Sequence, residues 1–160
     1  MTPEPLLTPA DADFVQGGVS INVAARTADL RPVMARALGC RVAADRREIR
    51  VFLSRSIAAS VLAGVEANGA IAAVFTLPST HQTLKLKATD ARILEVDPAE
   101  LWLIADYRRK FALDLASMGH SLEFAAAVVP MMDDLVAVRF TPSAAFDQTP
   151  GPDAGRALER

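Results

Sequence analysis

Residues 49–69, I-R-V-F-L-S-R-S-I-A-A-S-V-L-A-G-V-E-A-N-G, contain the change of pattern that decides the fold. Residues 49–53 are largely apolar and predict a buried strand. From Ser56 onward the apolar residues recur at the spacing of one helical face, at Ile57, Val61, Leu62 and Val65. Asn68 and Gly69 then supply a helix stop signal. The stretch therefore predicts a strand that passes into a helix at Ser54.

Further strands are predicted on both sides of this unit. Residues 19–25 read V-S-I-N-V-A-A, and their alternation of apolar with polar or small side chains is typical of a half-buried strand. Residues 33–43 predict a second strand that bends at Gly39, and residues 45–48 predict the charged tip of a hairpin. The remaining strands are predicted at residues 70–76, 84–94 and 135–140.

Two helices are predicted between the last two strands. Asp97 is a suitable N-cap, Pro98 suits the first helical position and Glu100 completes a capping box. These signals predict a helix over residues 98–118. A shorter helix is predicted over residues 122–129.

This order of elements predicts a mainly β fold with peripheral helices. Strands joined by short turns are usually antiparallel, and they close into a barrel or pack as a sandwich. The order is not the βαβ alternation of a Rossmann-type fold. We expect a lead-in with a short helix at residues 1–17, a barrel domain at 18–141 with a helical insertion at 97–129, and a C-terminal tail at 142–160.

The composition is that of one globular domain. Of the 160 residues, 51% are hydrophobic and 22% are charged, which excludes disorder as the main state. The net charge of −2 argues against a nucleic-acid surface. The start, residues 1–12, lacks the basic segment of a signal peptide, and no apolar stretch approaches the about 20 residues of a membrane span. We expect a cytoplasmic protein without nucleic-acid or membrane partners.

Metal and thiol chemistry are not indicated. The single cysteine, Cys40, excludes an intramolecular disulfide, and its apolar strand predicts a packed, inert thiol. The two histidines, His81 and His120, are far apart in the sequence and have no cysteine or paired carboxylate nearby. No metal site is therefore predicted.

Two arginines interrupt the second predicted strand. Arg36 and Arg41 lie among apolar residues, an arrangement that is costly unless their guanidinium groups face water or an anion. Their spacing places them on opposite faces of a regular strand unless a bulge at Gly39 brings them together. Anion binding and outward-facing ion pairs both fit this pattern.

The segment Ser54-Arg55-Ser56 stands where the strand passes into the helix. Free N–H groups and the helix dipole make such a position a natural phosphate cradle, and Arg55 adds a planar pair of donors. The alternative is that Ser54 or Ser56 is simply the N-cap of the helix.

A polar run, P-S-T-H-Q-T at residues 78–83, precedes L-K-L-K. The run gathers hydroxyls, an imidazole and an amide, which can bind a polar heteroaromatic ligand. Lys85 and Lys87 share one face of the following strand. An ordinary solvated strand face explains the alternation equally well.

Taken in order, these segments resemble the pyridoxamine 5′-phosphate oxidase-like proteins, which are FMN-binding split barrels. The resemblance runs from about Gly18 to Phe140 and lies in G-G-V-S-I-N-V-A, R-P-V-M-A-R-A-L-G-C-R-V, V-F-L-S-R-S, V-E-A-N-G-A-I-A-A-V-F and S-T-H-Q-T-L-K-L-K-A. It implies an antiparallel six-stranded split β-barrel that forms a homodimer, with FMN in a groove between the two subunits.

The resemblance also implies roles for residues of this chain. Arg36 and Arg41 would hold the flavin or its phosphate, and Gln82 or Thr83 would take the family's polar position at the mouth of the fifth strand. The end of the third strand would contact the cofactor through Leu53, Ser54, Arg55 and Ser56. We add His81 and Lys85, which flank the polar position, to the expected cofactor site.

The chain departs from the oxidase itself in two places. The oxidase has an Arg-Lys pair early in the helix, where this chain has Ile57, Ala58 and Ala59. The arginine–histidine substrate signature of the oxidase is not found in residues 144–155. The sequence therefore resembles a distant member with a different small-molecule substrate.

An FMN-dependent oxidoreductase is the leading functional hypothesis. Flavins carry out hydride chemistry, and the protein positions them. No catalytic residue is assigned, and His81 is the only candidate acid or base. The alternatives are a split barrel that binds haem or another small ligand as a binding or sensing module, and a deazaflavin-dependent reductase.

Overall fold

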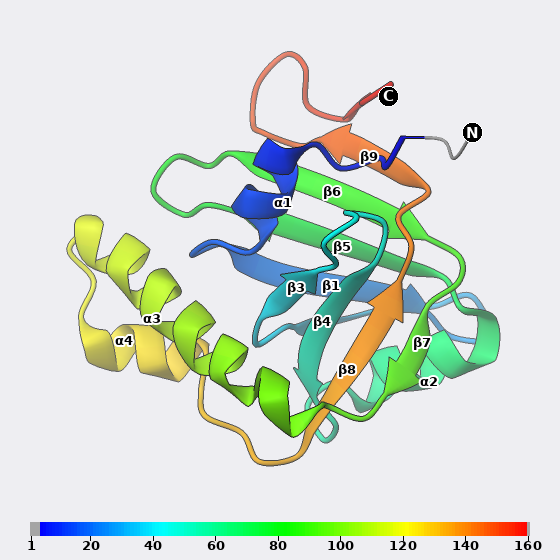
Figure 1. Cartoon of the computed structure of the whole chain (residues 1–160), viewed down its shortest axis with the longest axis horizontal. Coiled ribbons are helices and arrows are strands. Elements are labelled where there is room, and N and C mark those ends of the chain that lie inside the picture. Colours follow the sequence, from blue (N-terminus) through cyan, green and yellow to red (C-terminus); the bar gives the residue numbers. More distant parts are fainter. Residues whose placement is uncertain (1–3, 160) are drawn as a thin grey trace.

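The computed structural model describes residues 4–159, which fold into two antiparallel sheets with four α-helices (Figure 1). The six-stranded sheet has the spatial order β10 (Arg156–Ala157), β9 (Ala144–Asp147), β6 (Thr83–Ala88), β5 (Ile71–Thr76), β1 (Ser20–Arg26) and β2 (Pro32–Arg36). The four-stranded sheet has the order β3 (Cys40–Val42), β4 (Ile49–Ser54), β8 (Leu135–Phe140) and β7 (Arg92–Leu94). This is the mainly β, split-barrel architecture that the sequence predicts.

Two of the predicted strands divide and serve both sheets. The predicted strand 33–43 becomes β2 and β3, because the amide of Ala37 still bonds to Ile21 in β1 whereas the amide of Leu38 bonds to Phe52 in β4. Gly39 sits at this switch with a φ of +154°, which favours glycine. The bend predicted there is therefore confirmed, but it ends one strand and starts another.

The predicted strand 84–94 divides in the same way. It becomes β6 in the larger sheet and β7 in the smaller one, and residues 89–91 connect the two strands. The two shared segments hold the sheets together covalently, while the sheets themselves form separate hydrogen-bonded ladders within residues 4–159. The barrel is consequently split rather than closed.

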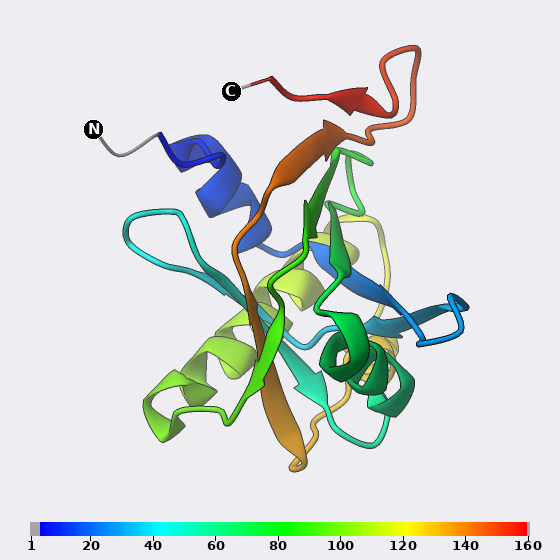
Figure 2. The ribbon, with the colours of Figure 1, turned by 90° about the vertical axis from the view of Figure 1, so that its right-hand side faces the viewer.

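The helices cover the ends and one side of the barrel. α1 (Pro9–Val15) and α2 (Ala59–Asn68) lie on opposite sides of it, and α3 (Leu101–Ser117) and α4 (Leu122–Val128) form a helical hairpin along it (Figure 2). The predicted helix 98–118 starts with a 3-10 turn, Pro98–Glu100, capped by Asp97. α2 begins later than predicted because the chain first forms a turn at residues 55–58.

The core lies between the two sheets. Its largest fully buried side chains include Phe52, Phe75 and Phe140, which come from both sheets. Cys40 is buried at the edge of this core, and burial raises the pKa of its thiol. In the part of the chain that the structure describes, no helix is long and apolar enough to cross a membrane.

The segment predicted as a C-terminal tail begins as part of the sheet. β9 pairs with β6 through four residue pairs, from Leu84 with Asp147 to Lys87 with Ala144. β10 then pairs with β9. Residues 144–147 therefore extend the six-stranded sheet and bring Phe146 beside β6.

Candidate functional site

The outer face of the six-stranded sheet is the strongest candidate site. Strand alternation turns Ile21, Val23, Phe75 and Leu86 into the core and leaves the intervening side chains on the opposite face. Strand register arranges this outer face in two rows. The first row is Arg36, Asn22, Val74, Lys85 and Phe146, and the second is Met34, Ala24, Ala72, Lys87 and Ala144.

This face carries positive charge without compensating carboxylates. Arg36 donates a 2.6 Å hydrogen bond to the Ser20 hydroxyl, and the ammonium groups of Lys85 and Lys87 lie 4.9 and 5.3 Å from the centre of the Phe146 ring. Among residues 4–159, none of the three cations has a carboxylate within ion-pair distance. The face therefore offers an aromatic ring together with cations, Arg36, Lys85 and Lys87, that no carboxylate of the described residues neutralises.

Small side chains hollow the second row into a groove. Ala24, Ala72 and Ala144 line it together with Lys87 and Arg26, and its volume is about 450 Å³. That volume is within the roughly 300–1,000 Å³ of typical small-molecule sites. The groove lies beside the lysines and Phe146, so one ligand can contact both rows.

The polar loop between β5 and β6 lies at one end of this face. Thr83 belongs to the sheet: its hydroxyl is 3.0 Å from that of Thr76, and it donates a 2.9 Å bond to the carbonyl of His81. His81 has a φ of +61° and is exposed, as is Gln82. Of the predicted site residues, Arg36, Thr83 and Lys85 thus share the outer face, with His81 and Gln82 at its end.

Arg41 lies elsewhere, on the outer face of the four-stranded sheet. There it pairs with Glu100, which also contacts Arg50. The sheet switch at Gly39 separates Arg41 from Arg36, so the bend does not bring the two guanidinium groups together. Arg41 instead belongs to a cross-strand row of arginines, Arg41, Arg50, Arg139 and Arg92, of which Arg50 and Arg139 also share Glu48.

The third predicted group lies at the end of β4. Leu53 is fully buried in the core, and Arg55 pairs with Glu95. The carboxylate of Asp134 accepts a 2.8 Å bond from the amide of Ser56 and a 2.5 Å bond from its hydroxyl. A carboxylate of the chain itself therefore lies at the predicted phosphate cradle.

Hydrogen bonding keeps that carboxylate charged. The hydroxyl and the amide of Ser56, followed by the Ser54 hydroxyl, lower the pKa of Asp134 to about 2. The second carboxylate oxygen, Oδ1, is buried and has no hydrogen-bond partner among the described residues. Asp134 is thus ionised at neutral pH, and only one of its two oxygens is hydrogen-bonded.

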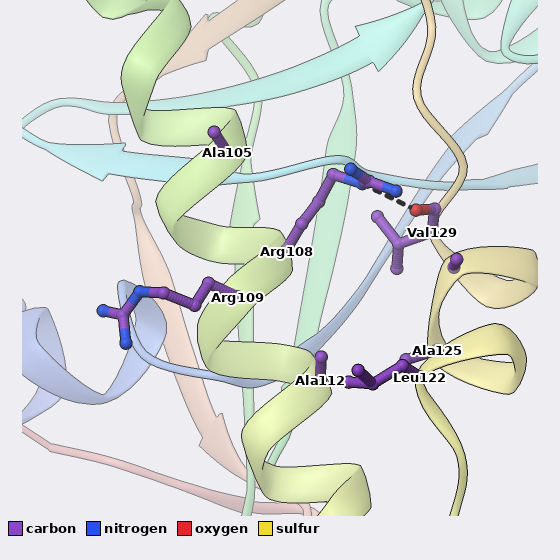
Figure 3. A pocket seen from close by; sticks show the side chains of 8 residues that line it. Ala105, Arg108, Arg109, Ala112, Leu122, Ala125 and Val129 are labelled. Atoms are coloured by element: carbon purple, nitrogen blue, oxygen red, sulfur yellow. Dashed lines mark hydrogen bonds between the residues drawn. The ribbon is translucent and has the colours of Figure 1, made fainter.

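A separate groove between α3 and α4 has a volume of about 290 Å³ (Figure 3). Its lining is mostly alanine and aliphatic, and its charged residues are Arg108 and Arg109. Arg108 donates a 2.9 Å bond to the carbonyl of Val129, as Figure 3 shows, and Arg109 pairs with Asp106. Both arginines are already engaged, so this groove is the weaker candidate.

Sequence reasoning missed two residues near the predicted sites. Phe146 lies in the segment that the sequence predicts as a tail, although A-A-F-D carries an aromatic residue that suits a strand. Asp134 has no local signal, because it reaches Ser56 across 78 positions through the pairing of β4 with β8.

Three solved structures are similar to the chain at low sequence identity. HupZ from Group A Streptococcus has a TM-score of 0.59 at 15% identity, over 94% of this chain and 100% of that one. An F420 reductase has a TM-score of 0.55 at 12% identity, over 87% and 98%. A pyridoxamine 5′-phosphate oxidase-related, FMN-binding protein from Nostoc punctiforme has a TM-score of 0.51 at 11% identity, over 97% and 99%.

Sequence comparison adds no closer relative: no family model and no curated protein matches the chain. The structural likeness covers nearly the whole of each neighbour. The chain therefore has the split-barrel fold of the pyridoxamine 5′-phosphate oxidase-related proteins, as the resemblance in its sequence predicts.

Proposed function

We propose that the protein binds a flavin-class cofactor, FMN or a deazaflavin, on the outer face of the six-stranded sheet and acts as an oxidoreductase on a small molecule. The observation that carries the proposal is a set of cations on this face, Arg36, Lys85 and Lys87, with no carboxylate within ion-pair distance among residues 4–159. Cations in such a position attract an anionic ligand, and charge-assisted hydrogen bonds to phosphate are strong.

The shape of the face suits a planar ligand. The row of small side chains, with Ala24 and Ala72 at its centre, allows a flat ring system to approach the sheet closely. Two of the similar folds support the choice of cofactor class, since one is an FMN-binding protein and another an F420 reductase.

A single copy offers only half of such a site. A flat sheet face contacts one side of a planar ligand and leaves the other side in water. A second copy related by a two-fold axis would present the same face from the other side. We therefore include a homodimer, with the cofactor groove at its interface, in the proposal.

A bound flavin would supply hydride transfer, and the chain would bind and orient it. Arg36 and Lys85 would hold anionic groups, and Thr83 would offer a hydroxyl to the polar edge of the ring. His81, at the end of the face, carries an imidazole, which can donate or accept a proton. We propose it as the candidate proton donor.

A second candidate is a binding or sensing module for haem or another small ligand. The carboxylate of Asp134 favours this candidate, because it lies where a flavin phosphate would be held at the start of α2. Such a module would use the same outer face without turnover.

Titration of the purified protein with FMN, a deazaflavin and haemin distinguishes these functions. We expect a shifted flavin spectrum and a raised Tm with one of the two flavins. Lys85→Glu should weaken binding by tenfold or more, whereas Arg92→Glu, on the outer face of the other sheet, should leave it unchanged. A protein that binds haemin alone would favour the sensing module, and one that binds none of the three would overturn both candidates.

A further inference from the structure

The turn at residues 55–58 has the shape of a phosphate cradle but no free donor. It follows β4 and precedes the ten-residue helix α2, so its amides lie at the positive end of the helix dipole. Each amide already has an acceptor. Arg55 bonds to the carbonyl of Asp134 at 2.8 Å and Ser56 to its carboxylate at 2.8 Å. Ile57 and Ala58 bond to the hydroxyl and the carbonyl of Ser54, at 3.3 and 2.9 Å.

The side chains of the turn are engaged as well. The Ser56 hydroxyl donates a hydrogen bond to Asp134. The Ser54 hydroxyl lies 3.1 Å from the Ser56 hydroxyl, and Ser54 is only 2% exposed. Arg55 pairs with Glu95. A phosphate placed here would lose these donors to the internal carboxylate and would also face its negative charge.

The turn at residues 55–58, which precedes α2, therefore does not fit the phosphate of a flavin. We infer that Asp134 determines specificity by keeping the phosphate of any bound cofactor away from this turn, so that anionic groups are held by the cations of the six-stranded sheet instead. The inference deepens the proposed function and rests on it for the identity of the ligand. That Asp134 fills an anion position follows from its hydrogen bonds with Ser56 alone.

Removal of the carboxylate should uncover the anion position. In Asp134→Ala, the amide and the hydroxyl of Ser56 lose their acceptor and become available to an external anion. Asp134→Leu also removes the acceptor while filling the space of the side chain, and it is used if the alanine variant does not fold. Asp133→Ala is the matched control, because Asp133 is an exposed neighbouring acid.

The test is a titration with inorganic phosphate in which binding is monitored through the amide NMR signals of Ser56 and Ile57. We expect these signals to shift in Asp134→Ala with an affinity at least tenfold above that of the wild type and of Asp133→Ala. Equal shifts in the wild type would overturn the inference, as would the lack of any shift in both Asp134 variants.

A parallel FMN titration separates the two proposals. FMN binding that moves the Ser56 amide in the wild type overturns the inference but not the proposed function. A failure to bind flavin overturns the proposed function, while the phosphate titration still decides the inference.

Discussion

The hydroxyl of Tyr107 in α3 donates a 2.7 Å hydrogen bond to the backbone carbonyl of Val19, directly before β1. Both residues are buried. The bond fastens the helical hairpin to the first strand of the six-stranded sheet, across 88 positions of sequence. β1 contributes Asn22 and Ala24 to the two rows of the candidate site, so the helical insertion supports the face without contributing residues to those rows.

Tyr107→Phe should destabilise the protein by about 1–3 kcal/mol, since the buried carbonyl of Val19 loses its donor. Urea denaturation measures this change as a lower midpoint at constant slope. Trp102→Phe is a suitable control, because Trp102 is a largely exposed aromatic residue of the same helix. Equal effects of the two substitutions would mean that the hydrogen bond contributes nothing beyond aromatic packing.

Gly39→Ala should also destabilise the fold. The φ of +154° at Gly39 belongs to a region in which side chains cost about 1–3 kcal/mol, and an added Cβ would lie 3.3 Å from the Phe52 ring. Gly151 has nearly the same φ, +153°, with no atom within 4 Å of an added Cβ. Thermal unfolding of both alanine variants separates backbone strain from packing. A smaller decrease in Tm for Gly39→Ala than for Gly151→Ala would contradict the structural importance of Gly39 at the sheet switch.

The strand pattern was predictable because burial imposes it locally. The alternation in residues 19–25 and the change of period at Ser54 follow from which side chains face the core, so β1, β4 and α2 can be read from the sequence. The division of residues 33–43 could not be predicted, because its small and apolar residues also suit one continuous strand. Only the pairing of Ala37 with β1 and of Leu38 with β4 fixes the switch.

The residues of the candidate site could likewise be predicted only in part. Arg36 and Lys85 attract attention because each is charged within an apolar strand, and the register then places them in one row. Phe146 joins that row only because β9 pairs with β6. Ser54-Arg55-Ser56 has the local pattern of a phosphate cradle, but whether its donors are free depends on Asp134, far along the chain.

Asp134 should make stability depend on pH in the acid range. Its pKa is about 2 in the folded protein against a usual 3.8, so the folded state holds the proton less tightly than the unfolded state does. The stabilisation is therefore complete above about pH 4 and is lost as the pH falls through about 2. Denaturation midpoints measured across this window should fall more steeply in the wild type than in Asp134→Asn. Parallel curves would show that the Ser56 hydrogen bonds do not favour the charged carboxylate.

Ala72→Glu tests the dimer and the cofactor face together. Ala72 lies at the centre of the second row, paired with Ala24 and Lys87, and its side chain points away from the core. A glutamate there should leave the monomer folded, but in the proposed dimer it would place a carboxylate between two copies of the sheet and beside the cations proposed to bind the ligand. We expect light scattering to show a dimer for the wild type and a monomer for this variant, and we expect flavin affinity to fall at least tenfold in the variant. Ala63→Glu, on the exposed side of α2, is the matched control and should change neither. A wild type that is monomeric while it binds flavin tightly would remove the second copy from the site, because one face would then suffice for the ligand.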